Sequence, residues 1–175
     1  MFAPTPPLEA VRTILSMAAT RSMWPHIKRL EELKVPDGHG ERRVQVSVID
    51  ISRAYFNAKT KDEDRVYVEL PEEDPDYGKG KCGKLLVHMY GTRKAADGWH
   101  GEYSETLEPM GFQRGVSSAC VFWHPLKGLL SSVHGGDFTT AGTLKTIKKE
   151  EYSIGLSGGR RKVIATKLTR DNMRN

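Results

Sequence analysis

Apolar and polar positions follow two different periods along the chain. Apolar residues recur at helical spacing from Leu8 to Ala19, which predicts an amphipathic helix over 8–19. From Val44 to Asp50, β-branched and polar residues alternate, as is typical of a half-buried strand. Similar patterns predict strands at 66–70, 84–89, 119–123, 129–134, 138–141 and 163–168, and helices at 22–33, 95–110 and 145–152.

Turn residues indicate how these segments connect. Gly135 and Gly136 separate two expected strands, and a Gly-Gly pair favours a two-residue turn, so we predict a β-hairpin over 129–141. Pro and Gly within 35–40 indicate a loop, and Gly111 is expected to end the helix over 95–110. Hairpins interspersed with helices predict an α+β fold with an antiparallel sheet, in preference to a doubly wound parallel sheet.

Composition places the chain among globular proteins. Its 175 residues suit one compact domain, with or without an extension, and 38% hydrophobic residues are enough for a core. The net charge of +5 would suit a polyanionic partner, but residues 145–175 hold nine Lys and Arg against three acids, whereas residues 1–144 hold 18 against 19. We interpret the basic tail as a solvated terminus and the eight carboxylates within 62–76 as a solvated loop.

Several classes of protein are disfavoured. No apolar run reaches the roughly 18–20 residues that span a bilayer, and the N-terminus lacks the pattern of a secretory signal. We therefore expect an intracellular chain, cytoplasmic or nuclear, that does not engage a membrane. Cys82 and Cys120 match no CxxC spacing and are expected to be reduced thiols. The six histidines lack the H-x-x-x-H and H-E-x-x-H spacings of zinc sites.

Two glycine-rich motifs have simpler interpretations. Residues 78–84 fit G-x-x-x-x-G-K, but Leu85 follows where a phosphate-binding loop has Ser or Thr, so we predict a surface turn. Residues 155–159 fit G-x-S-x-G, yet Arg160 and further basic residues follow in place of a helix, so we predict a flexible linker.

The residues with candidate chemistry lie at strand ends. Asp50 ends one expected strand, and Asp137 lies at the hairpin turn. Two carboxylates on rigid elements are what two-metal phosphoryl transfer needs, because Mg²⁺ prefers carboxylate oxygens. Tyr55 and the basic pair 93–94 lie between them in the sequence. Alone, these residues favour scattered structural carboxylates over a nucleotidyl-transfer site.

Three segments, in order, resemble the reverse transcriptase of copia-type retrotransposons. Asp50-Ile-Ser-Arg-Ala-Tyr55 resembles the family's D-x-x-x-A-F/Y motif, and Met89-Tyr-Gly-Thr-Arg-Lys-Ala-Ala-Asp-Gly-Trp99 resembles its Leu-Tyr-Gly-Leu-Lys-Gln-x-Pro-x-x-Trp segment. His134-Gly-Gly-Asp137 stands where the family has a Tyr-Val-Asp-Asp hairpin. Shorter similarities near 2–5, 66–71, 81–85 and 111–122 keep the family's order, so the resemblance covers residues 2 to about 142.

The resemblance implies an RNA-directed DNA polymerase with a fingers-and-palm architecture. Its partners would be an RNA/DNA template–primer and dNTPs, and its cofactors two Mg²⁺ ions. Asp50 and Asp137 would be the catalytic and metal-binding carboxylates, and Tyr55 would exclude a ribose 2′-hydroxyl from the dNTP pocket. Further dNTP-pocket residues would be Phe56 and Arg93, residues near the template–primer would be Tyr90, Gly91, Lys94 and Trp99, and the hairpin turn would comprise His134, Gly135 and Gly136.

One departure from the family pattern affects the chemistry directly. The alignment places Gly136 on the first hairpin aspartate, and glycine has no side chain to bind a metal. Loss of a direct electrostatic stabiliser commonly costs about 10²–10³ in rate, so we expect little or no polymerase activity. A register shifted by one residue would make Asp137 the first aspartate but leave Phe138 in place of the second. Lys94 and Ala96 also replace the family's Gln and Pro.

From the resemblance we expect three regions and no thumb. These are a fingers-like helical segment over 1–43, a palm/fingers core over 44–143 and a basic, truncated-palm segment over 144–175. The first functional hypothesis is a reverse transcriptase domain with impaired catalysis. The alternatives are a non-enzymatic nucleic-acid-binding remnant, whose basic tail would contact phosphates without reading sequence, and a transposon relic without function.

Overall fold

The computed structural model describes residues 6–19, 44–143 and 146–147. Predictions for 22–33, 35–40, 155–159 and 163–168 lie outside the described residues. So does most of the helix expected over 145–152, of which Thr146 and Ile147 are described and helical. In these described ranges, no helix has both the length and the apolar character needed to cross a membrane.

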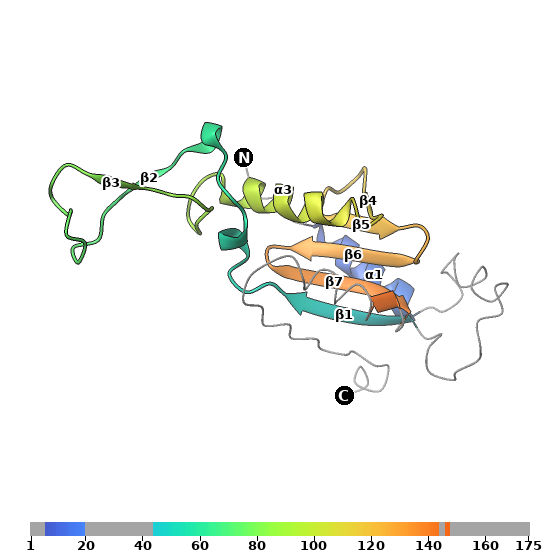
Figure 1. The fold of residues 1–175 in the computed structure, drawn as a ribbon. Coiled ribbons are helices and arrows are strands. Elements are labelled where there is room, and N and C mark those ends of the chain that lie inside the picture. The colour runs from blue at the N-terminus through green and yellow to red at the C-terminus, as the bar shows by residue number, and fades with distance from the viewer. Residues whose placement is uncertain (1–5, 20–43, 144–145, 148–175) are drawn as a thin grey trace, which may run out of the picture.

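The centre of the fold is an antiparallel five-stranded sheet with strand order β1-β7-β6-β5-β4 (Figure 1). Its strands are β1 (Val44–Asp50), β4 (Gln113–Arg114), β5 (Val121–His124), β6 (Leu129–His134) and β7 (Asp137–Thr143). β1 pairs with β7 along its whole length, from Val44 opposite Thr143 to Asp50 opposite Asp137. The β6–β7 hairpin turns at Gly135 and Gly136, as predicted. The predicted α+β class with an antiparallel sheet is thereby confirmed.

Helices α1 (Leu8–Ala19) and α3 (Ala95–Leu107) lie on opposite faces of the sheet (Figure 1). On one face, Ile14 of α1 packs with Val46 and Ala141. On the other, the α3 side chains of Trp99, Tyr103 and Leu107 share a larger core with sheet residues such as Phe122, Val133 and Phe138. Because side chains alternate between faces along a strand, each long strand contributes to both cores.

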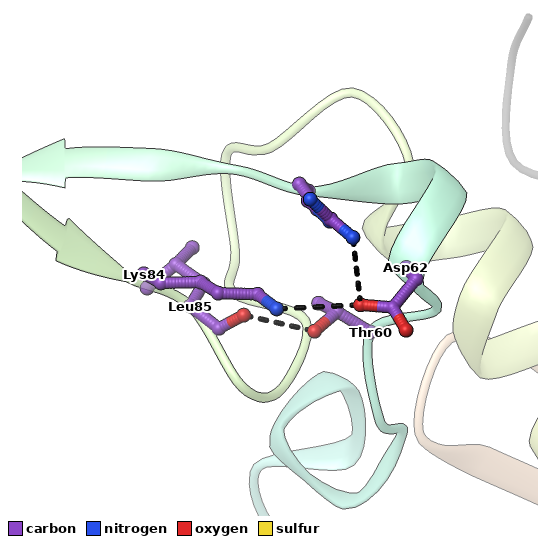
Figure 2. A network of polar contacts seen from close by, with 5 residues as sticks. Thr60, Asp62, Lys84 and Leu85 are labelled. Atoms are coloured by element: carbon purple, nitrogen blue, oxygen red, sulfur yellow. Dashed lines mark hydrogen bonds and ion pairs between the residues drawn. The ribbon is translucent and has the colours of Figure 1, made fainter.

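The residues that connect β1 to α3 in the sequence form a long arm, which extends from the end of the sheet (Figure 1). It contains the short helices η2 (Ala54–Asn57) and η3 (Asp62–Asp64) and a ribbon of β2 (Tyr67–Glu69) paired with β3 (Cys82–Lys84). Near its base, the Thr60 hydroxyl donates to the Leu85 carbonyl over 2.8 Å, and Lys84 pairs with Asp62 over 3.4 Å (Figure 2). The ion pair is exposed and contributes little, so backbone pairing holds most of the ribbon together.

The strand expected over 84–89 is wrong. β3 ends at Lys84, and beyond it Val87 forms only an isolated bridge with Lys59. The apolar residues after Lys84 resemble a strand, but their backbone bonds to separate segments in turn, with Leu85 on Val66, Leu86 on Thr60 and His88 on Ala58. A ladder needs one partner strand at successive positions, and these residues do not have one. In contrast, β7 runs on to Thr143, past its predicted end at Ala141, because β1 pairs with it over that whole length.

For the glycine-rich segment of the arm the prediction is confirmed, and for the acidic segment it is not. Residues 78–80 form exposed turns and Lys84 lies in a strand, which confirms a surface turn and not a phosphate-binding loop. The acidic stretch 62–76 is not one loop, because it contains η3 and β2. Sequence analysis did not predict the two-residue strand β4, which is too short to show a period.

Candidate functional site

The two strand-end carboxylates lie side by side. Asp50 ends β1, Asp137 begins β7, and the two residues are direct partners across the antiparallel pair. Partners of this kind have Cβ atoms about 4.5–5.5 Å apart on the same face of a sheet. The Asp50 side chain is half-buried and that of Asp137 is exposed, and His134, also exposed, pairs with Asp137 across the hairpin. The fold thus brings together the carboxylates that the sequence singled out.

The hairpin turn packs tightly on the segment that follows β1. Gly135 has a φ of +58° and Gly136 does not share a positive φ, which is the sign pattern of a type II′ turn. The Ile51 amide donates to the Gly136 carbonyl over 2.8 Å. A Cβ on Gly136 would lie 2.9 Å from the Ile51 carbonyl oxygen and 3.1 Å from Asp50 Oδ1. A side chain at position 136 would therefore begin beside the Asp50 carboxylate.

The donor set at this end of the sheet is incomplete for two metal ions. Asp50 and Asp137 supply carboxylate oxygens, which suit a hard cation such as Mg²⁺. Among the described residues, however, no group of three or more His, Cys, Asp or Glu side chains is arranged to hold a metal ion. Position 136, from which another carboxylate would meet Asp50, carries glycine. The residues present do not fit a two-ion centre.

An aromatic cluster joins the segment after β1 to the loop before α3. Tyr55 and Phe56 lie on η2, a few residues after Asp50, and Tyr90 comes from the loop between the arm and α3. The rings of Tyr55 and Tyr90 stack with centroids 4.3 Å apart and planes inclined by 29°, and the Phe56 and Tyr90 centroids are 5.7 Å apart. Tyr55 also packs against the larger core. The structure therefore joins residues from two separate sequence motifs.

The turn between β1 and η2 holds an unusual backbone conformation at Arg53. Its φ of 54° and ψ of 44° are left-handed, which side chains other than glycine seldom adopt. The Asn57 side-chain amide donates to the carbonyls of Arg53 and Ala54 over 3.2 and 3.3 Å and so stabilises this turn. A surface pocket of about 530 Å³ lies here, lined by Ser52, Arg53, Phe56 and Asn57. Nothing in the sequence signalled the left-handed residue or the pocket.

The residues of the second family-like motif, Met89 to Trp99, differ from one another in burial and in partners. Trp99 is buried, and its indole N–H donates to the Gly135 carbonyl over 2.7 Å, so it positions the hairpin turn from α3. Lys94 forms an ion pair with Asp64 at the base of the arm over 3.3 Å. Arg93 and Gly91 are exposed, and Gly91 has a φ of +88°, which makes glycine the favoured residue in that turn.

The contact between His88 and Gly98 joins the arm to α3. The His88 ring is buried against the helix, and a Cβ on Gly98 would overlap His88 Nε2. Only glycine at position 98 leaves room for the imidazole in this place. Sequence analysis did not single out either residue, although a glycine inside a predicted helix is a signal of close packing.

The cysteines are thiols, as expected, and neither is part of the site. Cys82 is exposed on β3, and Cys120 is buried in the core. Burial raises the pKa of Tyr103, as does its hydrogen bond with Cys120, and burial also raises the pKa of Cys120. Both groups are therefore neutral at pH 7, and the Cys120 thiol is not an activated nucleophile.

Comparison of the chain with protein-family models, curated proteins and solved structures finds no match.

Proposed function

We propose that the chain is a fingers-and-palm domain derived from a copia-type reverse transcriptase, in which RNA-directed DNA synthesis is impaired. The observation that supports this best is the pairing of Asp50 with Asp137 beside the β6–β7 turn. The two residues come from the first and last of three motifs that resemble the family. Their pairing across neighbouring strands puts two carboxylates at one end of the sheet, as template-directed phosphoryl transfer would need.

The aromatic cluster adds to this proposal. Tyr55, which by resemblance would exclude a ribose 2′-hydroxyl, lies on η2 directly after the strand that carries Asp50. Tyr90 from the second motif stacks on it, and Trp99 from the same motif donates to the hairpin turn. All three motifs therefore meet around one end of the sheet. A nucleotide bound there would contact residues from each motif.

Catalysis would be impaired because the site has too few carboxylate oxygens to bind metal ions. Two-metal phosphoryl transfer needs several carboxylate oxygens, and of the three positions at the hairpin end of the sheet only Asp50 and Asp137 supply them, because Gly136 contributes none. A missing transition-state stabiliser of this kind commonly costs about 10²–10³ in rate. The missing carboxylate at position 136 also favours a second candidate function, a nucleic-acid-binding remnant without catalysis. The basic residues of 145–175 would add salt-dependent affinity for nucleic acid.

The test is extension of a DNA primer on an RNA template with dNTPs and Mg²⁺. The unaltered chain is compared with Gly136→Asp, with Gly136→Ala and with the double variant Asp50→Asn, Gly136→Asp. The alanine variant adds the same Cβ beside the Ile51 carbonyl without a carboxylate, so it separates steric effects from chemical ones. We expect extension by Gly136→Asp alone, lost when Asp50 is also replaced.

Each outcome has a meaning. Extension by the unaltered chain would contradict the impairment. If no variant extends the primer, binding of the template–primer decides: salt-sensitive binding supports the non-catalytic remnant. No binding even at low salt would overturn both functions and leave the relic without function.

A further inference from the structure

Tyr90 covers the ring face of Tyr55. The two rings stack at 4.3 Å with an inclination of 29°, and Phe56 closes a second side of Tyr90 at 5.7 Å. Tyr55 is half-buried and packs against the core, and Tyr90 stacks on one face of its ring. Any ligand group that packed on this face of Tyr55 would occupy the place that the Tyr90 ring now fills.

The two rings differ in how firmly the fold holds them. Tyr55 lies on η2, where the Asn57 side-chain amide donates to the carbonyl of Arg53, just before the helix, and to that of Ala54. Tyr90 keeps about half of its surface exposed, with a relative exposure of 50%, and belongs to a turn closed by the Thr92 amide and hydroxyl on the Met89 carbonyl. Tyr90 is therefore the more exposed of the two rings, and Tyr55 is the one that packs against the core.

We propose that Tyr90 caps the ring of Tyr55 and that a nucleotide must displace Tyr90 before its sugar packs against Tyr55. This inference rests on the proposed function, and it assigns to Tyr90 a role opposite to that of a contact for the nucleotide. Stacked aromatic pairs contribute about 0.5–1.5 kcal/mol beyond the area they bury, which corresponds to about 2- to 12-fold in a binding constant. Removal of the ring should improve nucleotide affinity by that factor.

The experiment measures dTTP binding to the full chain by equilibrium dialysis. Tyr90→Ala removes the cap, and Tyr90→Phe keeps a ring that can still stack. Tyr77→Ala is the matched control, because Tyr77 is a similarly exposed tyrosine, at 41%, on the arm and outside the aromatic cluster. We expect Tyr90→Ala to bind dTTP about 2- to 12-fold more tightly than the unaltered chain. Tyr90→Phe and Tyr77→Ala should bind like the unaltered chain.

A second measurement does not depend on nucleotide binding. Nitration by tetranitromethane, mapped by mass spectrometry, should modify Tyr55 faster in Tyr90→Ala than in Tyr77→Ala. Equal or weaker dTTP binding by Tyr90→Ala, or no dTTP binding by any variant, overturns the cap, as does unchanged nitration of Tyr55. None of these results decides the proposed function, which is judged by primer extension and template–primer binding.

Discussion

Alanine substitutions at two glycines of α3 should have opposite effects on stability. Gly98 and Gly101 both lie inside the helix, where Gly→Ala is worth up to about 1 kcal/mol from helix propensity. At Gly101 an added Cβ meets no atom within 4 Å, so Gly101→Ala should stabilise by about 0.5–1 kcal/mol. At Gly98 the same Cβ would overlap Nε2 and Cδ2 of the His88 ring.

The Gly98 substitution cannot be accommodated without moving His88. The ring is only 3% exposed, and the His88 amide donates to the Ala58 carbonyl over 2.8 Å, which ties that backbone to the base of the arm. Overpacking in a filled core costs about 1–3 kcal/mol, which exceeds the gain in helix propensity. Gly98→Ala should therefore be less stable than Gly101→Ala by about 1–3 kcal/mol.

Thermal unfolding followed by circular dichroism at 222 nm measures the difference. At about 2–4 °C per kcal/mol for a chain of this size, the melting temperatures should differ by about 2–12 °C. In the background of His88→Ala, Gly98→Ala should lose its penalty, because the opposing ring is gone. If Gly98→Ala stabilises as much as Gly101→Ala, the reasoning about this contact is refuted.

Three further outcomes follow from the core around α3. Trp99→Phe removes the donor to the Gly135 carbonyl and should destabilise by about 1 kcal/mol, measured by urea unfolding; an unchanged midpoint would contradict its positioning role. Because burial raises the pKa of Tyr103 above its ordinary value of 10.0, folding stability should fall as the pH rises above 10, and Tyr103→Phe should flatten that decline in a pH series of melting temperatures. A thiol-reactive dye at pH 8 should label exposed Cys82 quickly and buried Cys120 only on unfolding; equal labelling rates would show that the core opens readily.

Elements with a strong period were predictable to the residue. The helix over Leu8–Ala19 and the strands Val44–Asp50 and Leu129–His134 have the predicted bounds, because in each the residue types favour one local conformation from end to end. The strand expected after Lys84 was wrong because an apolar run contains no information about whether a partner strand lies beside it. Boundaries in the arm depend on pairing between distant segments and not on local preference.

The candidate site was predictable in its membership but not in its contacts. The motif residues Asp50, Tyr55 and Asp137 were visible in the sequence as chemistry-bearing types in a family-like order. Neither the stacking of Tyr90 on Tyr55 nor the hydrogen bond from Trp99 to the hairpin had any signal in the sequence. Both contacts join segments that only the folded chain brings together.

The sequence by itself determined the periods of the main elements, the glycine turn of the hairpin and the absence of a carboxylate at position 136, since each is a property of the local residues. Tertiary structure decided that Asp50 lies opposite Asp137, because this β1–β7 register puts Ile49 in the core on the α3 side and Val46 in the core on the α1 side, and a one-residue slip would exchange the two faces. It also decided that Gly136 lies beside Asp50 and that His88 lies on Gly98. Side-chain packing between distant segments sets these distances, and no local preference specifies them.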